Sequence, residues 1–137
     1  MKTLALDVGT KTIGVAISDE LGITANGITT IQRKKHKSDL EELKAIVDEY
    51  KPDQIVVGLP YNSDGSLGER GKNIEKFAEK IKKFLKLPME FWDESFSTVN
   101  AENFLIQKGN VGRKKRKKVI DKMAAVVILQ EFLNSKA

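Results

Sequence analysis

The sequence predicts an α/β sandwich built on a mixed sheet, and three observations carry that prediction. Three β-rich runs precede the first helical pattern, which indicates an antiparallel start to the sheet. Two further short strands alternate with amphipathic helices, as in right-handed crossovers that connect parallel strands. No repeat or linker interrupts this order, so we expect residues 1–137 to form a single domain.

The N-terminal strands are expected at residues 3–8, 13–18 and 23–31. The first alternates strictly, so that Leu4, Leu6 and Val8 share one face and Asp7 lies on the other. A Gly-Thr turn joins the first two runs into a hairpin. The dipeptide Asn26-Gly27 predicts a bend or bulge in the third run.

Helical periodicity predicts the remaining elements. Ser38 and Glu41 form a capping box at the start of the first helix, which Pro52 ends. The wholly apolar run 55–57 predicts a parallel strand that is buried on both faces, and residues 89–92 predict the last strand. Further helices are expected at residues 74–85, 99–108 and about 117–133.

Composition excludes several kinds of site. The chain has no cysteine and a single histidine, so a disulfide framework, a thiolate nucleophile and a Cys- or His-rich metal site are all excluded. Any metal ion must therefore be held by oxygen. The N-terminal apolar stretch is too short for a signal peptide, and no run approaches the ~18 apolar residues of a membrane span. We expect a cytoplasmic protein with no membrane partner.

Six consecutive basic residues account for the whole net charge of +5. Without them the chain would carry 18 of its 24 Lys and Arg against 19 Asp and Glu. Such a patch attracts a polyanion and indicates nucleic acid, with a merely solvated loop as the alternative. This basic run consists of Arg113, Lys114, Lys115, Arg116, Lys117 and Lys118.

Acidic residues stand at two predicted strand ends. Asp7 is near the carboxyl end of the first strand, where open α/β sheets collect ligands, although it could also cap the following turn. Asp93 and Glu94 end the last strand, or form a solvated surface turn. Adjacent strand residues point to opposite faces, so only one of this pair can share the face of Asp7. Strand parity alone does not choose between them.

Asp121 stands on an apolar stripe of the last predicted helix, formed by Ala125, Ile128 and Phe132. Stabilisation by the helix dipole near the helix start is one explanation, worth about 0.3–1 kcal/mol. The basic run just before Asp121 opposes that dipole, however. We interpret the arrangement as functional: phosphates dock on the basic run, which delivers the nucleic-acid backbone to the carboxylate.

Three carboxylates suit hard cations such as Mg²⁺ or Mn²⁺. Two such ions can activate water and stabilise the leaving oxygen in phosphodiester cleavage, without any histidine. His36 lies in a basic loop at residues 33–37, where solvation or phosphate contact explains it better than a role as a base.

Four motifs in order resemble the YqgF family, also called RuvX, of bacterial RNase H-like nucleases. They span essentially the whole chain: LALDVGTKTIGVAISD (4–19), IVVGLPYNSDGSLGERG (55–71), DESFST (93–98) and KKRKKVIDKMAAVVILQEFL (114–133). The resemblance implies an RNase H-like three-layer sandwich with a mixed five-stranded sheet. It also implies an endonuclease that matures the 5′ end of pre-16S rRNA in ribosome biogenesis, or else resolves Holliday junctions in branched DNA.

By this resemblance, Asp7, Glu94 and Asp121 are the catalytic metal-binding acids, with Asp93 as a reserve ligand. Arg70, in the substrate-side loop around residues 62–70, becomes a candidate phosphate contact. Turn formation and helix capping by Asp64 or Ser66 are the alternative role of that loop.

Ser95 stands where the family commonly has Arg, which leaves one substrate contact in doubt. A nucleic-acid-binding module without catalysis is an alternative of another class. An actin-like ATPase would need two such domains and a second glycine-rich loop, for which 137 residues leave no room. The sequence leaves open whether the protein is a monomer or a homodimer.

Overall fold

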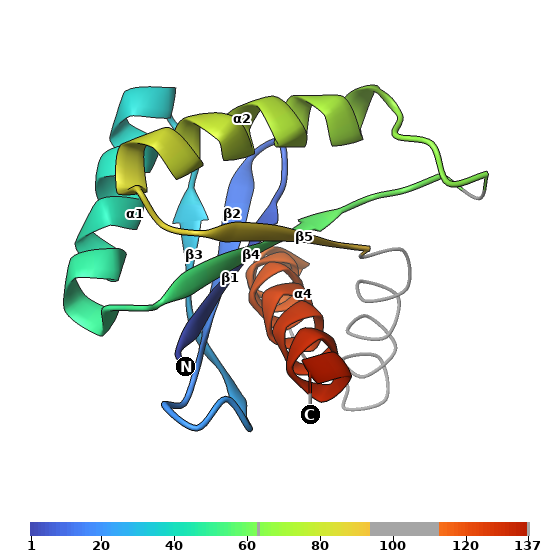
Figure 1. Ribbon diagram of the computed structural model, residues 1–137. Coiled ribbons are helices and arrows are strands. Elements are labelled where there is room, and N and C mark those ends of the chain that lie inside the picture. Colours follow the sequence, from blue (N-terminus) through green and yellow to red (C-terminus); the bar gives the residue numbers. More distant parts are fainter. Residues whose placement is uncertain (63, 94–112, 137) are drawn as a thin grey trace.

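The computed structural model describes residues 1–62, 64–93 and 113–136, with the backbone alone for residues 36 and 113–122. Eight elements follow one another along these segments (Figure 1). They are β1 (Thr3–Val8), β2 (Thr12–Ser18), β3 (Ala25–Gln32), α1 (His36–Tyr50), β4 (Gln54–Leu59), α2 (Glu69–Leu85), β5 (Met89–Asp93) and α4 (Arg113–Lys136).

The five strands form one mixed sheet in the order β3-β2-β1-β4-β5. β2 is antiparallel to both β1 and β3, whereas β4 is parallel to both β1 and β5. The predicted fold class is thereby confirmed. Because β1, β3, β4 and β5 run in the same direction, their carboxyl ends meet at one side of the sheet, which we call the carboxyl edge.

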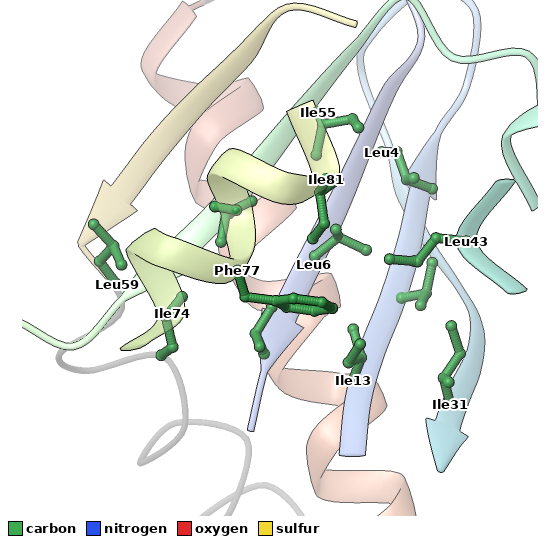
Figure 2. Packing of buried hydrophobic residues seen from close by; sticks show 14 of the residues in the cluster. Leu4, Leu6, Ile13, Ile31, Leu43, Ile55, Leu59, Ile74, Phe77 and Ile81 are labelled. Carbon is green, nitrogen blue, oxygen red and sulfur yellow. The ribbon is translucent and has the colours of Figure 1, made fainter. Parts of the chain in front are cut away.

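Alternating residues of β1 supply two hydrophobic clusters on opposite faces of the sheet. Leu4 and Leu6 pack with Leu43 of α1 and with Phe77 of α2 (Figure 2). The intervening Ala5 instead packs with α4, in a cluster whose other buried members include Ala16, Val56, Ala125 and Ile128. Helices α1 and α2 therefore cover one face and α4 covers the other, as Figure 1 shows.

Helix α4 runs antiparallel to β1. Near its C-terminal end, Gln130 accepts a hydrogen bond from the backbone N–H of Ala25 at 3.1 Å and donates one to the carbonyl oxygen of Ile23 at 3.0 Å. Lys136 forms an ion pair with Glu90 of β5 at 3.4 Å. These partners lie at the edge where β1 begins, so the N-terminal part of α4 extends toward the carboxyl edge.

Three predicted helix starts were wrong. Helix α1 begins at His36, and its N-cap Lys35 makes no side-chain cap, so Ser38 and Glu41 do not form the predicted capping box. Instead, the Asp39 carboxylate in the first turn accepts a hydrogen bond from the backbone N–H of Lys34 at 3.0 Å. Helix α4 begins at Arg113, about four residues earlier than predicted, because Lys and Arg are good helix formers and extend it.

Helix α2 begins at Glu69, five residues before the predicted start at Ile74, and the other described boundaries agree closely with those expected from the sequence. The predicted bulge in β3 is present beside Gly27, where the register with β2 shifts between Val15 and Ala16. The helix expected at 99–108 lies outside the described residues. Within the described part of the chain, no helix is both long and apolar enough to cross a membrane.

Candidate metal centre at the carboxyl edge

Of the three acids predicted to bind metal, Asp7 is the one whose side chain the structure describes. It pairs with Gly14 of β2 across the antiparallel ladder, and only 8% of its surface is exposed. Alternation along β1 places it on the same face as Ala5, the face that α4 covers. A charged group at this depth costs several kcal/mol unless cations or hydrogen bonds compensate it. Burial of this kind is expected of a metal ligand.

The backbone places Asp121 at the same end of the sheet. Ala125 of α4 and Ala5 of β1 belong to one buried cluster. Asp121 lies about 6 Å before Ala125 along the helix, and Asp7 lies about 6.6 Å beyond Ala5 along the strand. Because the two elements are antiparallel, both steps lead toward the carboxyl edge. The side chain of Asp121 is outside the description.

The earlier start of α4 changes how Asp121 and the basic run are interpreted. Asp121 is the ninth residue of the helix rather than part of its first turn. The dipole effect fades beyond the first turn, so it no longer explains this carboxylate. The backbone of the run Arg113–Lys118 is helical rather than a loop. The run forms the N-terminal end of α4, which extends toward the carboxyl edge.

The register of β5 places Asp93 on the face opposite Asp7. Trp92 packs on the α4 side, where its indole N–H donates to Glu131 at 3.3 Å and its ring meets Phe132 edge-on at 5.9 Å. Asp93, the next residue along the strand, is exposed and faces the side of α1 and α2. Glu94 lies outside the described residues.

A clamp built around Arg33 holds the turn that follows Asp7. The guanidinium donates to the carbonyl oxygen of Gly9 at 2.7 Å and pairs with the Asp39 carboxylate at 3.5 Å. It also lies over the Phe77 ring, 4.5 Å from the centroid. Within the turn, the N–H of Gly9 donates to the carbonyl of Thr12 at 2.8 Å. Sequence reasoning missed this clamp, because it joins three elements and no local motif signals it.

Replacing Arg33 by methionine should lower the free energy of unfolding by about 2–3 kcal/mol. The change removes the hydrogen bond to Gly9 and leaves Asp39, 1% exposed, without its cation. Urea unfolding would measure the loss. Lys34→Met removes the same charge from the exposed neighbouring residue and should cost far less; equal losses in both variants would contradict the clamp.

The loop after β4 adopts the turn that its sequence allows. The N–H of Asn62 donates to the carbonyl of Ser66 at 2.8 Å, and Gly65 adopts φ +86. Hydrogen bonds from the Ser66 hydroxyl and backbone N–H lower the pKa of Asp64. Neither Ser66 nor Asp64 caps α2, whose N-cap is Gly68.

The same kind of turn chemistry occurs at the opposite edge of the sheet. There the N–H groups of Ile23 and Thr24 donate to Asp19 and lower its pKa. This carboxylate lies at the end of β2, remote from the carboxyl edge.

Arg70 is the second residue of α2 and is exposed close to the carboxyl edge. It lines a groove together with Gly9 and Thr10 of the turn after β1. Among the side chains that are described, no three acidic, histidine or cysteine residues gather as a metal cluster. The three-acid set therefore stays a prediction, since the side chains of Glu94 and Asp121 are outside that description.

Comparison with known proteins agrees with this geometry. The family described as "RuvX: Holliday junction resolvase" matches residues 1–135. A protein of Caldanaerobacter subterraneus subsp. tengcongensis is 51% identical over 135 residues, covering 98% of this chain and 97% of its own length. One of Geobacillus kaustophilus is 55% identical over 138 residues, covering 99% of each chain. Both carry the name "Putative pre-16S rRNA nuclease".

Solved structures show the same fold at low sequence identity. RuvC of Thermus thermophilus, in complex with a Holliday junction substrate, superposes with a TM-score of 0.61 at 12% identity, covering 99% of this chain and 96% of its own. The Fowlpox virus resolvase, in complex with Holliday junction DNA, gives 0.60 at 14% identity and covers 99% of both chains. The described sheet and helices are thus those of RNase H-like resolvases.

These matches also confirm the enzyme class that the acidic motifs predicted, a hydrolase acting on phosphodiester bonds. With residues 1–135 matched and more than half of the aligned positions identical to relatives of equal length, the chain belongs to the RuvX family.

Proposed function

We propose that this chain is a divalent-metal-dependent endonuclease that matures the 5′ end of pre-16S rRNA in the cytoplasm. The observation that carries the proposal is the buried carboxylate of Asp7 at the carboxyl edge, on the face toward which the N-terminal part of α4 extends. The name shared by the full-length relatives supports rRNA as the substrate. Residues 1–137 act as one domain in this proposal.

The donor set fits Mg²⁺ or Mn²⁺. With no cysteine and one histidine in the chain, the ligands are carboxylates, which hard cations prefer. Asp7, Glu94 and Asp121 would hold the ion or ions. Because Asp93 lies on the opposite face from Asp7, Glu94 is preferred over it. A bound pair of such ions would activate water and stabilise the leaving oxygen.

The chain's own residues would bind and orient the nucleic acid. Arg70 and the basic run, from Arg113 to Lys118, contact phosphates on either side of Asp7, because α2 and α4 cover opposite faces of the sheet and both begin toward its carboxyl edge. The Arg33 clamp holds the turn after Asp7 and so keeps that carboxylate in register with the phosphate. Contacts to the backbone fix position without reading sequence.

Resolution of Holliday junctions is the second candidate, supported by the description of the family itself. The same acids could cleave either RNA or DNA. The test incubates the purified protein with Mg²⁺ or Mn²⁺ and two labelled substrates, an RNA spanning the 5′ end of 16S rRNA with its leader and a four-way DNA junction. We expect cleavage of the RNA in the leader. Junction cleavage without RNA cleavage would reverse the order of the two candidates.

Two further results would decide between catalysis and simple binding. Retained binding with no cleavage of either substrate would favour a non-catalytic module. A crystal structure soaked in Mn²⁺ should place an ion against Asp7, Glu94 and Asp121, and an ion held by Asp93 instead would refute the proposed ligand set.

A further inference from the structure

A groove of about 840 Å³ runs along α2 on the face of the sheet opposite Asp7. Its inner wall is apolar and includes Val8, Ile74 and Phe77, the last two of which point from α2 toward the sheet (Figure 2). Gly9 and Thr10 close one end of it, directly after β1. This α2 groove therefore starts at the carboxyl edge and leads away from it along the helix.

The described residues that line the α2 groove carry an excess of positive charge. Five are cations, and two, Glu69 and Glu79, are acids. Arg33 already pairs with Asp39, and the other four cations are exposed. The exposed cations of the groove are Arg70, Lys76, Lys80 and Lys83.

Three of these cations follow one another along one flank of α2, and Arg70 lies about a third of a turn around the helix from them. Lys76, Lys80 and Lys83 are spaced by four and three residues, so each lies about one turn from the next, and Arg70 stands nearest the carboxyl edge. From Arg70 to Lys83 the helix rises about 20 Å. Cations spread over that length match the phosphates along one extended strand better than they match a single small anion.

We propose that the α2 groove binds a second, uncleaved stretch of the substrate's sugar-phosphate backbone, which continues from the carboxyl edge along α2. The inference rests on the proposed function, because it takes the substrate to be nucleic acid. Charge complementarity identifies the occupant as a polyanion, and the common end at Gly9 and Thr10 makes the groove continuous with the site of Asp7.

The test compares two double variants of equal charge. K76Q/K83Q removes two exposed cations from the groove, whereas K72Q/K82Q removes two exposed cations of α2 that do not line it. The probes are a labelled RNA hairpin with a long single-stranded 5′ extension and the same hairpin without the extension. Binding is measured without divalent metal across a salt series, and cleavage is measured separately with Mn²⁺.

K76Q/K83Q should bind the extended RNA several-fold more weakly than K72Q/K82Q does, and its salt slope should fall by about 1.4, which is about 0.7 for each lost phosphate contact. On the hairpin without extension the two variants should agree. Equal affinities on the extended RNA, or a change of oligomeric state without a change in RNA affinity, would overturn the proposal. Absence of Mn²⁺-dependent cleavage in the unaltered protein would instead count against the proposed function. The comparison of RNA affinities between the two variants would still test whether the α2 groove binds nucleic acid.

Discussion

Asp7→Asn is expected to lower the rate of cleavage by about a thousand-fold or more, equivalent to about 4 kcal/mol of lost transition-state stabilisation. Asparagine keeps the shape of the side chain but removes the negative charge that would hold the metal ion. The buried position should accept the neutral group, since it no longer carries the desolvation cost of a carboxylate. Single-turnover cleavage with Mn²⁺ measures the rate, and urea unfolding verifies that stability is retained.

Asp93→Asn is the matched control. It makes the same chemical change at the end of β5, two strands away from β1 and on the opposite face of the sheet. We expect Asp93→Asn to cleave at nearly the normal rate and Asp7→Asn to bind nucleic acid with little loss of affinity. Full cleavage by Asp7→Asn, or an equal defect in Asp93→Asn, would refute the metal centre as proposed.

The face of Asp7 could be predicted because it depends on local alternation. Leu4, Leu6 and Val8 form one apolar face of β1, and that pattern alone puts Asp7 on the other. The position of Asp121 on an apolar stripe is local in the same way, since Ala125 and Ile128 of that stripe are buried against the sheet. The face of a strand residue and the apolar stripe of a helix both follow from the spacing of neighbouring residues, so both could be predicted from the sequence.

The choice between Asp93 and Glu94 could not be made from the sequence, because it depends on pairing between strands. Val56 faces α4 and is opposite Glu90 in the parallel register of β4 and β5. That register puts Trp92 toward α4 and Asp93 away from it. No pattern within β5 encodes this, since its exposed and half-buried residues alternate weakly.

The start of α1 was predicted wrongly for a related reason. Ser38 and Glu41 have the spacing of a capping box, but Asp39 binds Arg33 and the backbone of Lys34, and the N-cap is Lys35, three residues before Ser38. A tertiary contact overrode a local signal.

The distribution of charge was predicted only in part. The basic run accounts for the net charge of the whole chain, yet α2 by itself carries six basic and three acidic residues. Sequence reasoning followed the apolar stripe of this helix and did not consider its cations. Their recurrence every three or four residues was the available signal, and its meaning emerges only once the groove beside them is seen.

Replacing Lys114, Lys115, Arg116 and Lys117 together by glutamine should weaken nucleic-acid binding by about a hundred-fold near physiological salt and reduce the salt slope by about 3. Each phosphate contact releases about 0.7–0.9 of a counterion, so four lost contacts give a change of that size. Glutamine is a good helix former, so the first turns of α4 should persist. Fluorescence anisotropy across a salt series measures the affinity and the slope together.

The matched control replaces four exposed lysines outside the basic run, Lys44, Lys72, Lys82 and Lys86, by glutamine. It alters the net charge equally, so any difference between the two variants reports position rather than overall charge. An unchanged slope in the basic-run variant would mean that the run is only solvated. Combining that variant with K76Q/K83Q separates two arrangements. If the run and the α2 groove bind separate stretches of one strand, the losses in slope should add, whereas competition for the same phosphates would make the combined loss smaller than the sum.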